Sequence, residues 1–499
     1  MPCRKINNTH STSVNFQLPR EAIEKMPSQS HVLLMSFPLQ GHVNPLVRLG
    51  RRLAAKGLLV TFTTFRHAGL RALPDDDGSC VGHGGRLRFE YLRSHDDLSR
   101  TDPTDMLRHV VDVGPAALAG LLRRQAGAGR PVACVVNNCF VPWALDVARG
   151  MGVPYCATLW IQSCAVLSLY YHFYSFPEAG QGFPSDADPN RAVALPGLPT
   201  VAADELPLMV RPEYASNLWG DMLRAQLGQI DKGVVSWVLV NTFEGLERSV
   251  IDALRAHTSV TPVGPLLEQD GHDGDDNKLV VAADDDNDGC MAWLDAQQPR
   301  SVVYVAFGSL VDIGHDETLA VAEGLLRNGR PFLWVVRDDS RELFLGDDQL
   351  AACRGRGGKG KIVAWCPQGR VLAHGAVGCF VTHCGWNSAA EALAAGVPVV
   401  GYPWWSDQFT NAKFLVEEYR VGVRLPAPVT GDALRACVEE VMSGPEAAAF
   451  RMRATAWKEE AEAAIADGGS SDRNLDDFVA YMALALVAAA TRQPGEEVN

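Results

Sequence analysis

Short apolar runs alternate with helical patterns along most of the chain. Residues 31–37 (HVLLMSF) form a continuous apolar run, residues 44–55 have the apolar spacing of a helix, and residues 58–64 (LLVTFTT) are apolar again. Asn44 and Pro45 suit the N-cap and the first position of this helix, and Gly57 suits its end. Continuous apolar strands separated by helices are typical of a parallel sheet covered on both faces.

The same alternation continues through both halves of the chain. Further strands are predicted at residues 131–137, 153–159, 235–241, 301–307, 332–336, 361–364, 377–382 and 397–402. The pattern predicts an α/β protein with two doubly wound parallel sheets and a cleft between them. In such folds ligands lie at the carboxyl ends of the strands. We expect a first domain over residues 30–255, a linker over 256–295, a second domain over 296–470 and a helical terminal segment over 471–499.

Two polar stretches interrupt this pattern. Residues 1–29 are polar and lack the apolar core of a signal peptide, so we expect a disordered extension and a cytosolic protein. Residues 268–289 are rich in Asp and Gly, which predicts an exposed mobile loop within the linker. The longest apolar run, residues 478–490, is too short to span a bilayer.

Composition narrows the function. The 499 residues are 47% hydrophobic and 21% charged, as in a soluble globular protein. The net charge of -14 argues against binding to nucleic acid or an anionic membrane. It does not exclude an anionic ligand, since a helix N-terminus can bind a phosphate. The twelve cysteines include no CxxC pair, which favours buried free thiols.

Acidic clusters offer only a weak metal hypothesis. Asp284, Asp286, Asp288 and Gly289 match the start of a calcium-binding loop, but Asp295 stands where a bidentate Glu is needed. These residues, and the run at residues 75–77, could also imitate the Asp-x-Asp metal site of some sugar transferases. Both lie in polar Gly-rich segments, so solvated loop charge is the favoured interpretation and no metal site is predicted.

Residues 365–408 carry the strongest chemical signal. A strand at 377–382, a tight turn with Gly385 and a helix over 387–395 place a helix N-terminus at the end of a strand. Such a terminus binds anions. His383, Asn387 and Ser388 can donate further hydrogen bonds to a diphosphate. Alternatively, Ser388 and Glu391 have capping-box spacing and only start the helix.

This segment resembles, over its full length, the signature of plant secondary-product glycosyltransferases, the family-1 enzymes that use UDP-sugars. The residues in register are Trp365, Gln368, His374, His383 to Ser388, Glu391, Pro398, Pro403, Asp407 and Gln408. The wider resemblance covers residues 31–490, including FPLQGHVNP at 37–45 and SVVYVAFGS at 301–309. It implies the GT-B fold of two facing Rossmann-like domains, a terminal helix that returns to the first domain, a monomer, and no metal or cofactor besides the donor UDP-glucose.

The resemblance also implies roles for the donor site. Trp365 is expected to stack on the uracil near Gln368, and Glu391 to accept the ribose hydroxyls. The diphosphate is assigned to His383, Asn387, Ser388 and Ser309, and the sugar to Trp386, Asp407 and Gln408. Gln408 together with Trp386 matches the version of the motif that prefers glucose.

His42 follows the first strand and, by the resemblance, is the general base. Relatives orient this base with an Asp, but here the position is Asn138. An amide can hold the tautomer of the ring, yet it cannot stabilise an imidazolium as a carboxylate does. A carboxylic acid, with a pKa near ~4, arrives ionised and needs little base help, whereas a phenol has a pKa near ~10. Asn138 therefore favours an acid as acceptor. The alternative is that Asp146 supplies the charge.

Residues 31–64, 137–148 and 159–165 resemble the subgroup that makes glucose esters of hydroxycinnamic and hydroxybenzoic acids, some of whose relatives accept indole acids or phenolic hydroxyls. That subgroup usually has Gly where this chain has Leu39. The bulkier Leu39 is expected to narrow the acceptor pocket. Candidate pocket residues are Leu39, Gln40, Trp143, Trp160, Gln162 and Tyr170, with core packing as the alternative for the aromatic ones. The sequence predicts an inverting glucosyltransferase that forms 1-O-β-glucose esters of small aromatic acids. The alternatives are O-glucosylation of phenols or flavonoids, and a non-catalytic UDP-sugar-binding protein.

Overall fold

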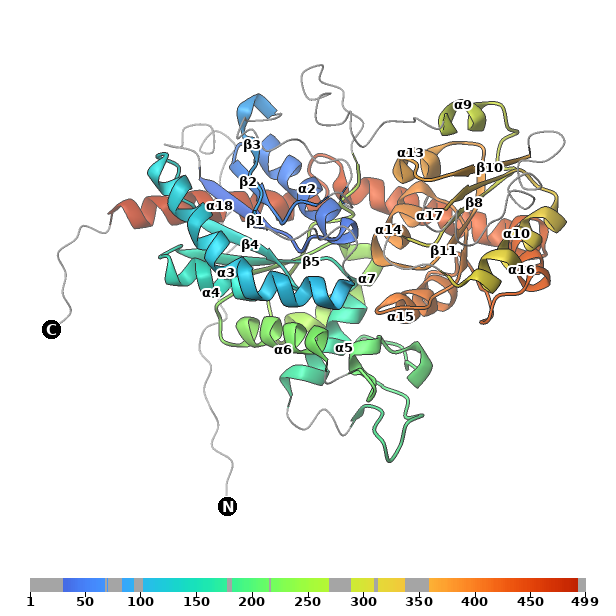
Figure 1. Cartoon of the computed structure of the whole chain (residues 1–499), viewed down its shortest axis with the longest axis horizontal. Helices are drawn as coiled ribbons and strands as arrows, with labels where there is room; N and C mark the ends of the chain where they lie inside the picture. Colours follow the sequence, from blue (N-terminus) through green and yellow to red (C-terminus); the bar gives the residue numbers. More distant parts are fainter. Residues whose placement is uncertain are drawn as a thin grey trace.

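Two parallel sheets, each with helices on both faces, stand side by side (Figure 1). The computed structural model describes residues 30–67, 70, 83–93, 102–176, 182–214, 217–268, 289–308, 313–336 and 359–491. This arrangement confirms the predicted fold of two doubly wound α/β domains.

The N-terminal sheet has the strand order β3-β2-β1-β4-β5-β6-β7, all parallel. Its direction of winding reverses between β1 and β4, which creates a binding crevice at their carboxyl ends. Its strands are β1 His31–Met35, β2 Leu59–Thr63, β3 Leu87–Phe89, β4 Cys134–Asn138, β5 Tyr155–Trp160, β6 Trp237–Val240 and β7 Val260–Pro262. The main helices are α2 Gln40–Ala55, α3 Pro103–Gly127, α4 Trp143–Gly150, α5 Cys164–Ser175, α6 Leu218–Asp231 and α7 Glu244–Arg255.

The C-terminal sheet has the order β10-β9-β8-β11-β12-β13, again parallel, with its reversal between β8 and β11. Its strands are β8 Val302–Ala306, β9 Phe332–Val335, β10 Gly360–Val363, β11 Val377–Thr382, β12 Val399–Gly401 and β13 Gly422–Arg424. Its helices are α9 Cys290–Asp295, α10 His315–Asn328, α13 Gln368–Ala373, α14 Trp386–Ala395, α15 Gln408–Lys413, α16 Gly431–Ser443 and α17 Ala447–Ile465.

The central strand β8 is apolar throughout because it is buried on both faces. Val302 and Tyr304 pack into the cluster under α14 and α17, whereas Val303 and Val305 pack into the cluster under α10 and α16. Successive side chains of a strand point to opposite faces, so a strand buried on both faces has no polar alternation.

The predicted start of the second element, at Asn44, is wrong. Helix α2 begins at Gln40 with Leu39 at the N-cap, and Pro45 therefore lies inside it. Proline has no N–H, so the Gly41 carbonyl one turn earlier lacks its helical donor. Asn387 of the C-terminal domain donates to that carbonyl at 2.6 Å instead. The proline thus leaves an acceptor free for the C-terminal domain. Strands β3, β7 and β13, of three residues each, were not predicted.

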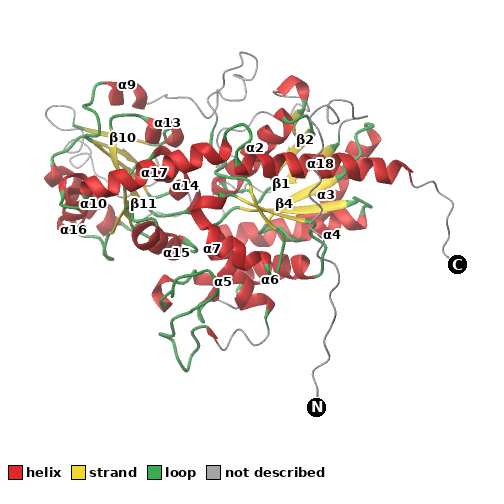
Figure 2. Cartoon of the chain, turned by 180° about the vertical axis from the view of Figure 1, so that it is seen from behind, coloured by secondary structure: helices red, strands yellow, loops and turns green. Residues whose placement is uncertain are grey.

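The last helix, α18 Ser470–Thr491, runs from the C-terminal domain back along the N-terminal one (Figure 2). Phe478 and Tyr481 pack against Trp237 of β6. Ser471 donates to the Gly264 carbonyl at 2.6 Å, and Lys56, the residue that follows α2, pairs with Asp472 at 2.6 Å. Helix α18 thereby completes the N-terminal domain.

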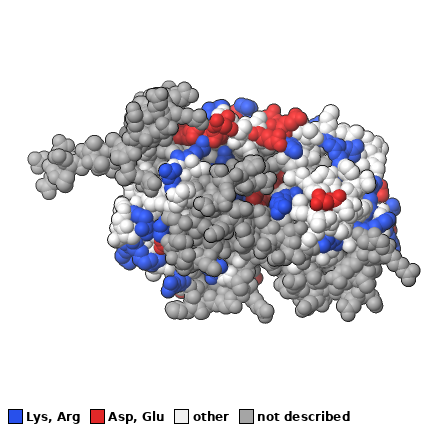
Figure 3. All heavy atoms as spheres, turned by 90° about the horizontal axis from the view of Figure 1, so that it is seen from above, with Lys and Arg blue, Asp and Glu red and all other residues white. Residues whose placement is uncertain are grey.

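Charged side chains of both signs are interspersed over the described part of the face in Figure 3, although the chain is acidic overall. Among the described residues, no helix combines the length and the apolarity that crossing a bilayer would require.

The packing of α18 predicts that replacing a side chain with Ala lowers the free energy of unfolding by an amount that depends on how buried that side chain is. Phe478 is fully buried, so Phe478→Ala should lower the free energy of unfolding by about 3–5 kcal/mol. Leu484, on the same helix, is 42% exposed, and Leu484→Ala should change it by less than about 0.5 kcal/mol. Urea denaturation of both variants measures the difference, and equal small effects would contradict this placement of the helix.

Candidate active site

His42 and Asn138 meet at the reversal point of the N-terminal sheet. His42 lies in the first turn of α2, just after β1, and Asn138 is the last residue of β4. Because β1 and β4 are parallel neighbours, their carboxyl ends lie together. His42 Nδ1 is 3.2 Å from Asn138 Oδ1. The structure therefore brings together the two residues predicted for catalysis.

A backbone contact fixes the orientation of the Asn138 amide. The Phe140 N–H donates to the same Oδ1 at 3.0 Å, and an N–H group can only donate. The atom that faces both partners is therefore the amide oxygen. His42 must then carry its proton on Nδ1, so Nε2 keeps the lone pair that can accept a proton.

Aromatic rings enclose the His42 imidazole. Phe37 and Phe140 lie 5.4 Å and 5.3 Å from it between ring centroids. Burial lowers the pKa of His42 to about 4, and the hydrogen bond that His42 donates to Asn138 opposes this only in part. The ring is therefore neutral at physiological pH, and it is a weak base.

Asp146, the alternative partner for His42, has a different contact. It lies on α4 and accepts a hydrogen bond from Gln229 Nε2 at 2.7 Å, in an exposed position. The geometry favours Asn138 as the partner.

The N-terminus of α14 faces the carboxyl end of β11. Its N-cap is Gly385, and no described side chain caps it. Ser388 and Glu391 do not form a capping box, because the helix already begins at Trp386. The Ser388 hydroxyl instead accepts from Gln368 Nε2 at 3.0 Å. The alternative that these residues only start the helix is therefore wrong, and the amide groups at this end remain suited to an anion.

Two glycines make the space for His383. A Cβ at residue 385 would lie 2.5 Å from His383 Nε2, and a Cβ at residue 308 would lie 2.7 Å from the same atom. Gly308 also has a φ of +88°, which few other residues adopt. Burial lowers the pKa of His383 to about 4, so a neutral ring sits between the loops after β8 and β11.

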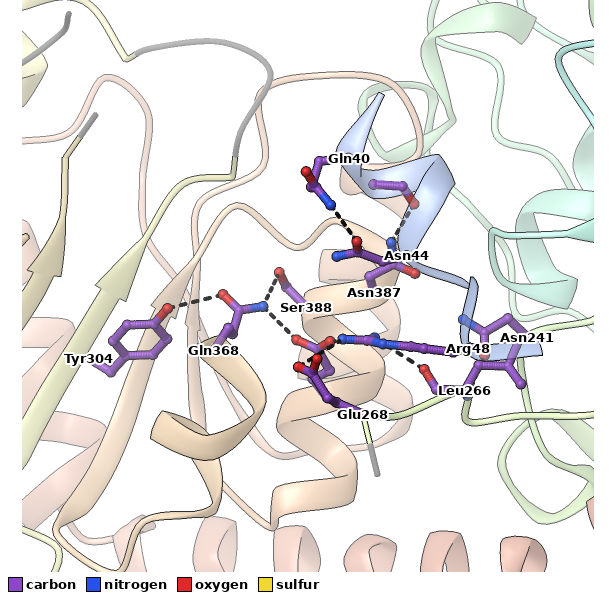
Figure 4. A network of polar contacts seen from close by, with 12 residues as sticks. Gln40, Asn44, Arg48, Asn241, Leu266, Glu268, Tyr304, Gln368, Asn387 and Ser388 are labelled. Carbon is purple, nitrogen blue, oxygen red and sulfur yellow. Dashed lines mark hydrogen bonds and ion pairs between the residues drawn. The ribbon is translucent and has the colours of Figure 1, made fainter. Parts of the chain in front are cut away.

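A chain of polar contacts links the predicted donor residues to one another (Figure 4). Gln368 Nε2 donates to Glu391 Oε2 at 2.7 Å, and Tyr304 donates to Gln368 Oε1 at 3.1 Å. The other carboxylate oxygen of Glu391 accepts from Arg48 Nη1 at 2.7 Å. Arg48 belongs to α2, so this network crosses from one domain to the other.

The three residues predicted to contact the sugar have separate environments. The Trp386 indole N–H donates to the Asn241 carbonyl at 2.7 Å. The Trp386 side chain is thus a contact between the domains, and only the backbone N–H of Trp386 is left to bind a ligand. Asp407 is buried, which raises its pKa, and it accepts from Asn411 at 2.7 Å. Gln408 Oε1 accepts from the backbone N–H groups of the two preceding tryptophans, at 3.1 Å and 3.0 Å.

The predicted acceptor residues divide into two groups. Gln162 hydrogen-bonds Asp407, and the buried Tyr170 lies beside Asp407 and Ser406, so these two meet the donor domain. Trp160 is fully buried and packs edge-on against Tyr170.

The remaining candidates have contacts within the N-terminal domain. The Trp143 ring fills the space beside Gly114 of α3, where a Cβ would lie 2.4 Å from it, so the core-packing alternative holds for this residue. Leu39 packs partly buried against the N-terminal core, and Gln40 donates to Asn44 Oδ1 at 2.5 Å.

Several predictions concern other positions. Ser309, the Asp run at 75–77 and Asp284, Asp286 and Asp288 lie outside the described residues. Trp365 is half-buried in the loop between β10 and α13. Asp295, the twelfth position of the weak calcium motif, pairs with His374 at 3.1 Å. Within the described ranges, no group of three or more His, Cys, Asp or Glu residues is placed to hold a metal ion.

Three polar residues of this site were not predicted. Arg48 is one of several basic residues in α2, and nothing in its spacing marks it as buried. Asn411 donates to Asp407 and to the Cys384 carbonyl, and it accepts from Ser163 of the other domain. Asn241 follows a strand, which is the signal that could have identified it.

Comparison with known proteins agrees with this geometry. Residues 245–456 match the family described as UDP-glucoronosyl and UDP-glucosyl transferase. The chain is 40% identical to gallate 1-beta-glucosyltransferase of Quercus robur, with 90% of this chain and 89% of that protein covered. It is 39% identical to cinnamate beta-D-glucosyltransferase of Fragaria ananassa, with 90% and 82% covered. The crystal structure of Os79 from O. sativa in complex with UDP has a TM-score of 0.75 at 30% identity, with 90% and 100% covered.

The enclosure of His383 predicts a steric effect at the helix N-terminus. In Gly385→Ala the new Cβ would displace His383, and the affinity for UDP should fall about tenfold. The backbone at residue 385, with a φ of -58°, accommodates alanine, so the effect is steric. Gly375→Ala is the control, because a Cβ there meets nothing within 4 Å. Titration calorimetry with UDP measures both, and an unchanged affinity in the first variant would refute this account of His383.

Proposed function

Because this chain belongs to the UDP-glucoronosyl and UDP-glucosyl transferase family, we propose that it transfers glucose from UDP-glucose to the carboxyl group of a small aromatic acid. The product is a 1-O-β-glucose ester. The names of two relatives, which act on gallate and on cinnamate, support this acceptor class. The single observation that carries it is the amide partner of His42.

The state of His42 supports an acceptor that is already ionised. Burial between two aromatic rings lowers the pKa of His42 to about 4, so proton transfer from a phenol of pKa near ~10 is strongly uphill. A carboxylic acid with a pKa near ~4 presents a carboxylate without help. An Asp at position 138 would repel that carboxylate, whereas Asn138 does not. The neutral pair thus suits an anionic nucleophile.

The proposed reaction is a single displacement. One carboxylate oxygen of the acceptor attacks the anomeric carbon of the glucose, the bond from that carbon to the diphosphate breaks, and the configuration inverts from α to β. The negative charge that develops on UDP is stabilised by the N-terminus of α14, with His383, Asn387 and Ser388 as further donors. Glu391 accepts the ribose hydroxyls, Trp365 stacks on the uracil, and Asp407 and Gln408 hold the sugar.

Three further expectations remain part of this proposal. The reaction needs no metal ion, since the helix terminus supplies the electrostatic stabilisation. A single chain forms both halves of the site, so a monomer suffices. The location is the cytosol.

The first test is a screen of acceptors. The protein is incubated with UDP-glucose and a panel of benzoates, cinnamates and flavonols, and products are treated with mild alkali. We expect turnover chiefly of the acids, with products that alkali hydrolyses, because esters are labile and glycosides are not. Alkali-resistant products from flavonols would favour O-glucosylation instead. UDP binding without release of UDP from any mixture would favour a non-catalytic protein.

The second test concerns the amide. Asn138→Asp places a carboxylate beside His42, which should raise the pKa of the ring and raise kcat/KM for phenols relative to acids by about tenfold. Asp146→Asn is the control, because Asp146 contacts Gln229 and should leave this ratio unchanged. If the ratio stays constant in Asn138→Asp while the protein remains folded, the amide does not select the acceptor.

A further inference from the structure

Arg48 is a buried cation that leaves its own domain. It lies on α2, the helix that carries His42, and its Nη1 donates to Glu391 Oε1 at 2.7 Å and to the Leu266 carbonyl at 3.1 Å. A second carboxylate, Glu268, is 3.9 Å from Nη2. The side chains of Arg48 and Glu391 are each only 9% exposed. Figure 4 shows the guanidinium reaching α14 beside Glu268 and Leu266.

The Glu391 carboxylate is held from two sides. Arg48 from the N-terminal domain holds Oε1, and Gln368 from the C-terminal domain holds Oε2 at 2.7 Å. Gln368 is fixed in turn by Tyr304, which donates to its amide oxygen. A carboxylate oxygen can accept two hydrogen bonds, so an oxygen that accepts one from Arg48 or Gln368 keeps a lone pair for another donor. The carboxylate is therefore fixed in orientation and still able to accept.

We propose that Arg48 is a positioning residue for the donor nucleotide: it holds the Glu391 carboxylate in the orientation that accepts the ribose hydroxyls of UDP-glucose. This inference rests on the proposed function, in which Glu391 meets the ribose. Arg48 itself does not touch the reacting atoms.

Electrostatics explain why such a residue is needed. A carboxylate that is this buried pays a desolvation penalty unless a cation is paired with it. With Arg48 removed, one oxygen of Glu391 loses its partner and the carboxylate can rotate. A rotated carboxylate accepts the ribose hydroxyls poorly.

The position of Arg48 on α2 gives the contact a second consequence. The same helix presents His42 at its first turn and Arg48 further along. Asn387 of α14 also donates to the Gly41 carbonyl of that turn at 2.6 Å. The C-terminal domain therefore contacts α2 at two points. These contacts fix the position of the Glu391 carboxylate relative to His42.

The test compares UDP with 2′-deoxy-UDP, which lacks one ribose hydroxyl. The wild-type protein should bind UDP about tenfold more tightly, because a hydrogen bond to a charged group is lost in the analogue. In Arg48→Met, which keeps the bulk of the side chain, this preference should shrink to about twofold, mainly through weaker binding of UDP. Calorimetric titration of the full-length protein measures both ligands.

Arg52 provides the matched control. It lies one turn further along α2 and donates to the Val263 carbonyl at 3.0 Å, within its own domain. Arg52→Met should lower the melting temperature and leave the preference for UDP at its wild-type value. A double variant with Arg48→Met and Glu391→Gln should lose no more UDP affinity than Glu391→Gln alone, because the two residues act as one unit.

The results distinguish a failure of the role of Arg48 from a failure of the proposed function. Equal losses of UDP and 2′-deoxy-UDP affinity in Arg48→Met, or an unchanged preference, would overturn the positioning role of Arg48. A wild-type protein that binds neither nucleotide would overturn the proposed function, and the inference with it. Arg48→Lys should restore part of the preference, since Nη1 alone donates to both the Leu266 carbonyl and Glu391, and one ammonium nitrogen carries three donors.

Discussion

A buried ion pair between the two domains sets the geometry on which the rest of the site depends. Arg48 and Glu391 are at hydrogen-bonding distance, and both are largely removed from water. Such a pair is costly when either partner is missing, so the two domains are favoured in the position where both are present. The contact of Asn387 with Gly41 adds a second link, which exists because Pro45 leaves a carbonyl without its helical donor. The carboxyl ends of the two sheets are thereby held face to face.

The charge balance of the site is consistent with its proposed chemistry. The donor side offers a helix N-terminus and neutral side chains to a diphosphate, and the acceptor side offers a neutral histidine with a neutral amide. Aromatic rings around His42 keep it uncharged. An anionic nucleophile can enter such a pocket without meeting a fixed negative partner of the base. The low pKa of His42 and the amide at residue 138 thus favour the same acceptor class.

The sequence was most informative where burial leaves a simple pattern. Strands such as β8 and β11 are apolar on both faces, so their runs identify them, and their ends locate His383 and the predicted anion site. The three-residue strands β3, β7 and β13 were missed, whereas β12, of the same length, was predicted because it lies in the longer apolar run at 397–402. The start of α2 was misplaced because Pro45 suits a first helical turn. Inside the helix it leaves the Gly41 carbonyl without a donor, and the replacement donor, Asn387, is far along the chain. Arg48 could not be identified for the same reason, since its partner is on the other domain.

The return of α18 has a consequence for dividing this protein. Residues 470–491 follow the C-terminal sheet in the chain but pack against Trp237 and pair with Lys56 in the first domain. A single cut in the linker therefore cannot release two complete units, because the amino-terminal fragment would expose the apolar surface that this helix covers. An exchange of acceptor halves between relatives would have to transplant two separate stretches of polypeptide, the second of them from beyond the C-terminal sheet.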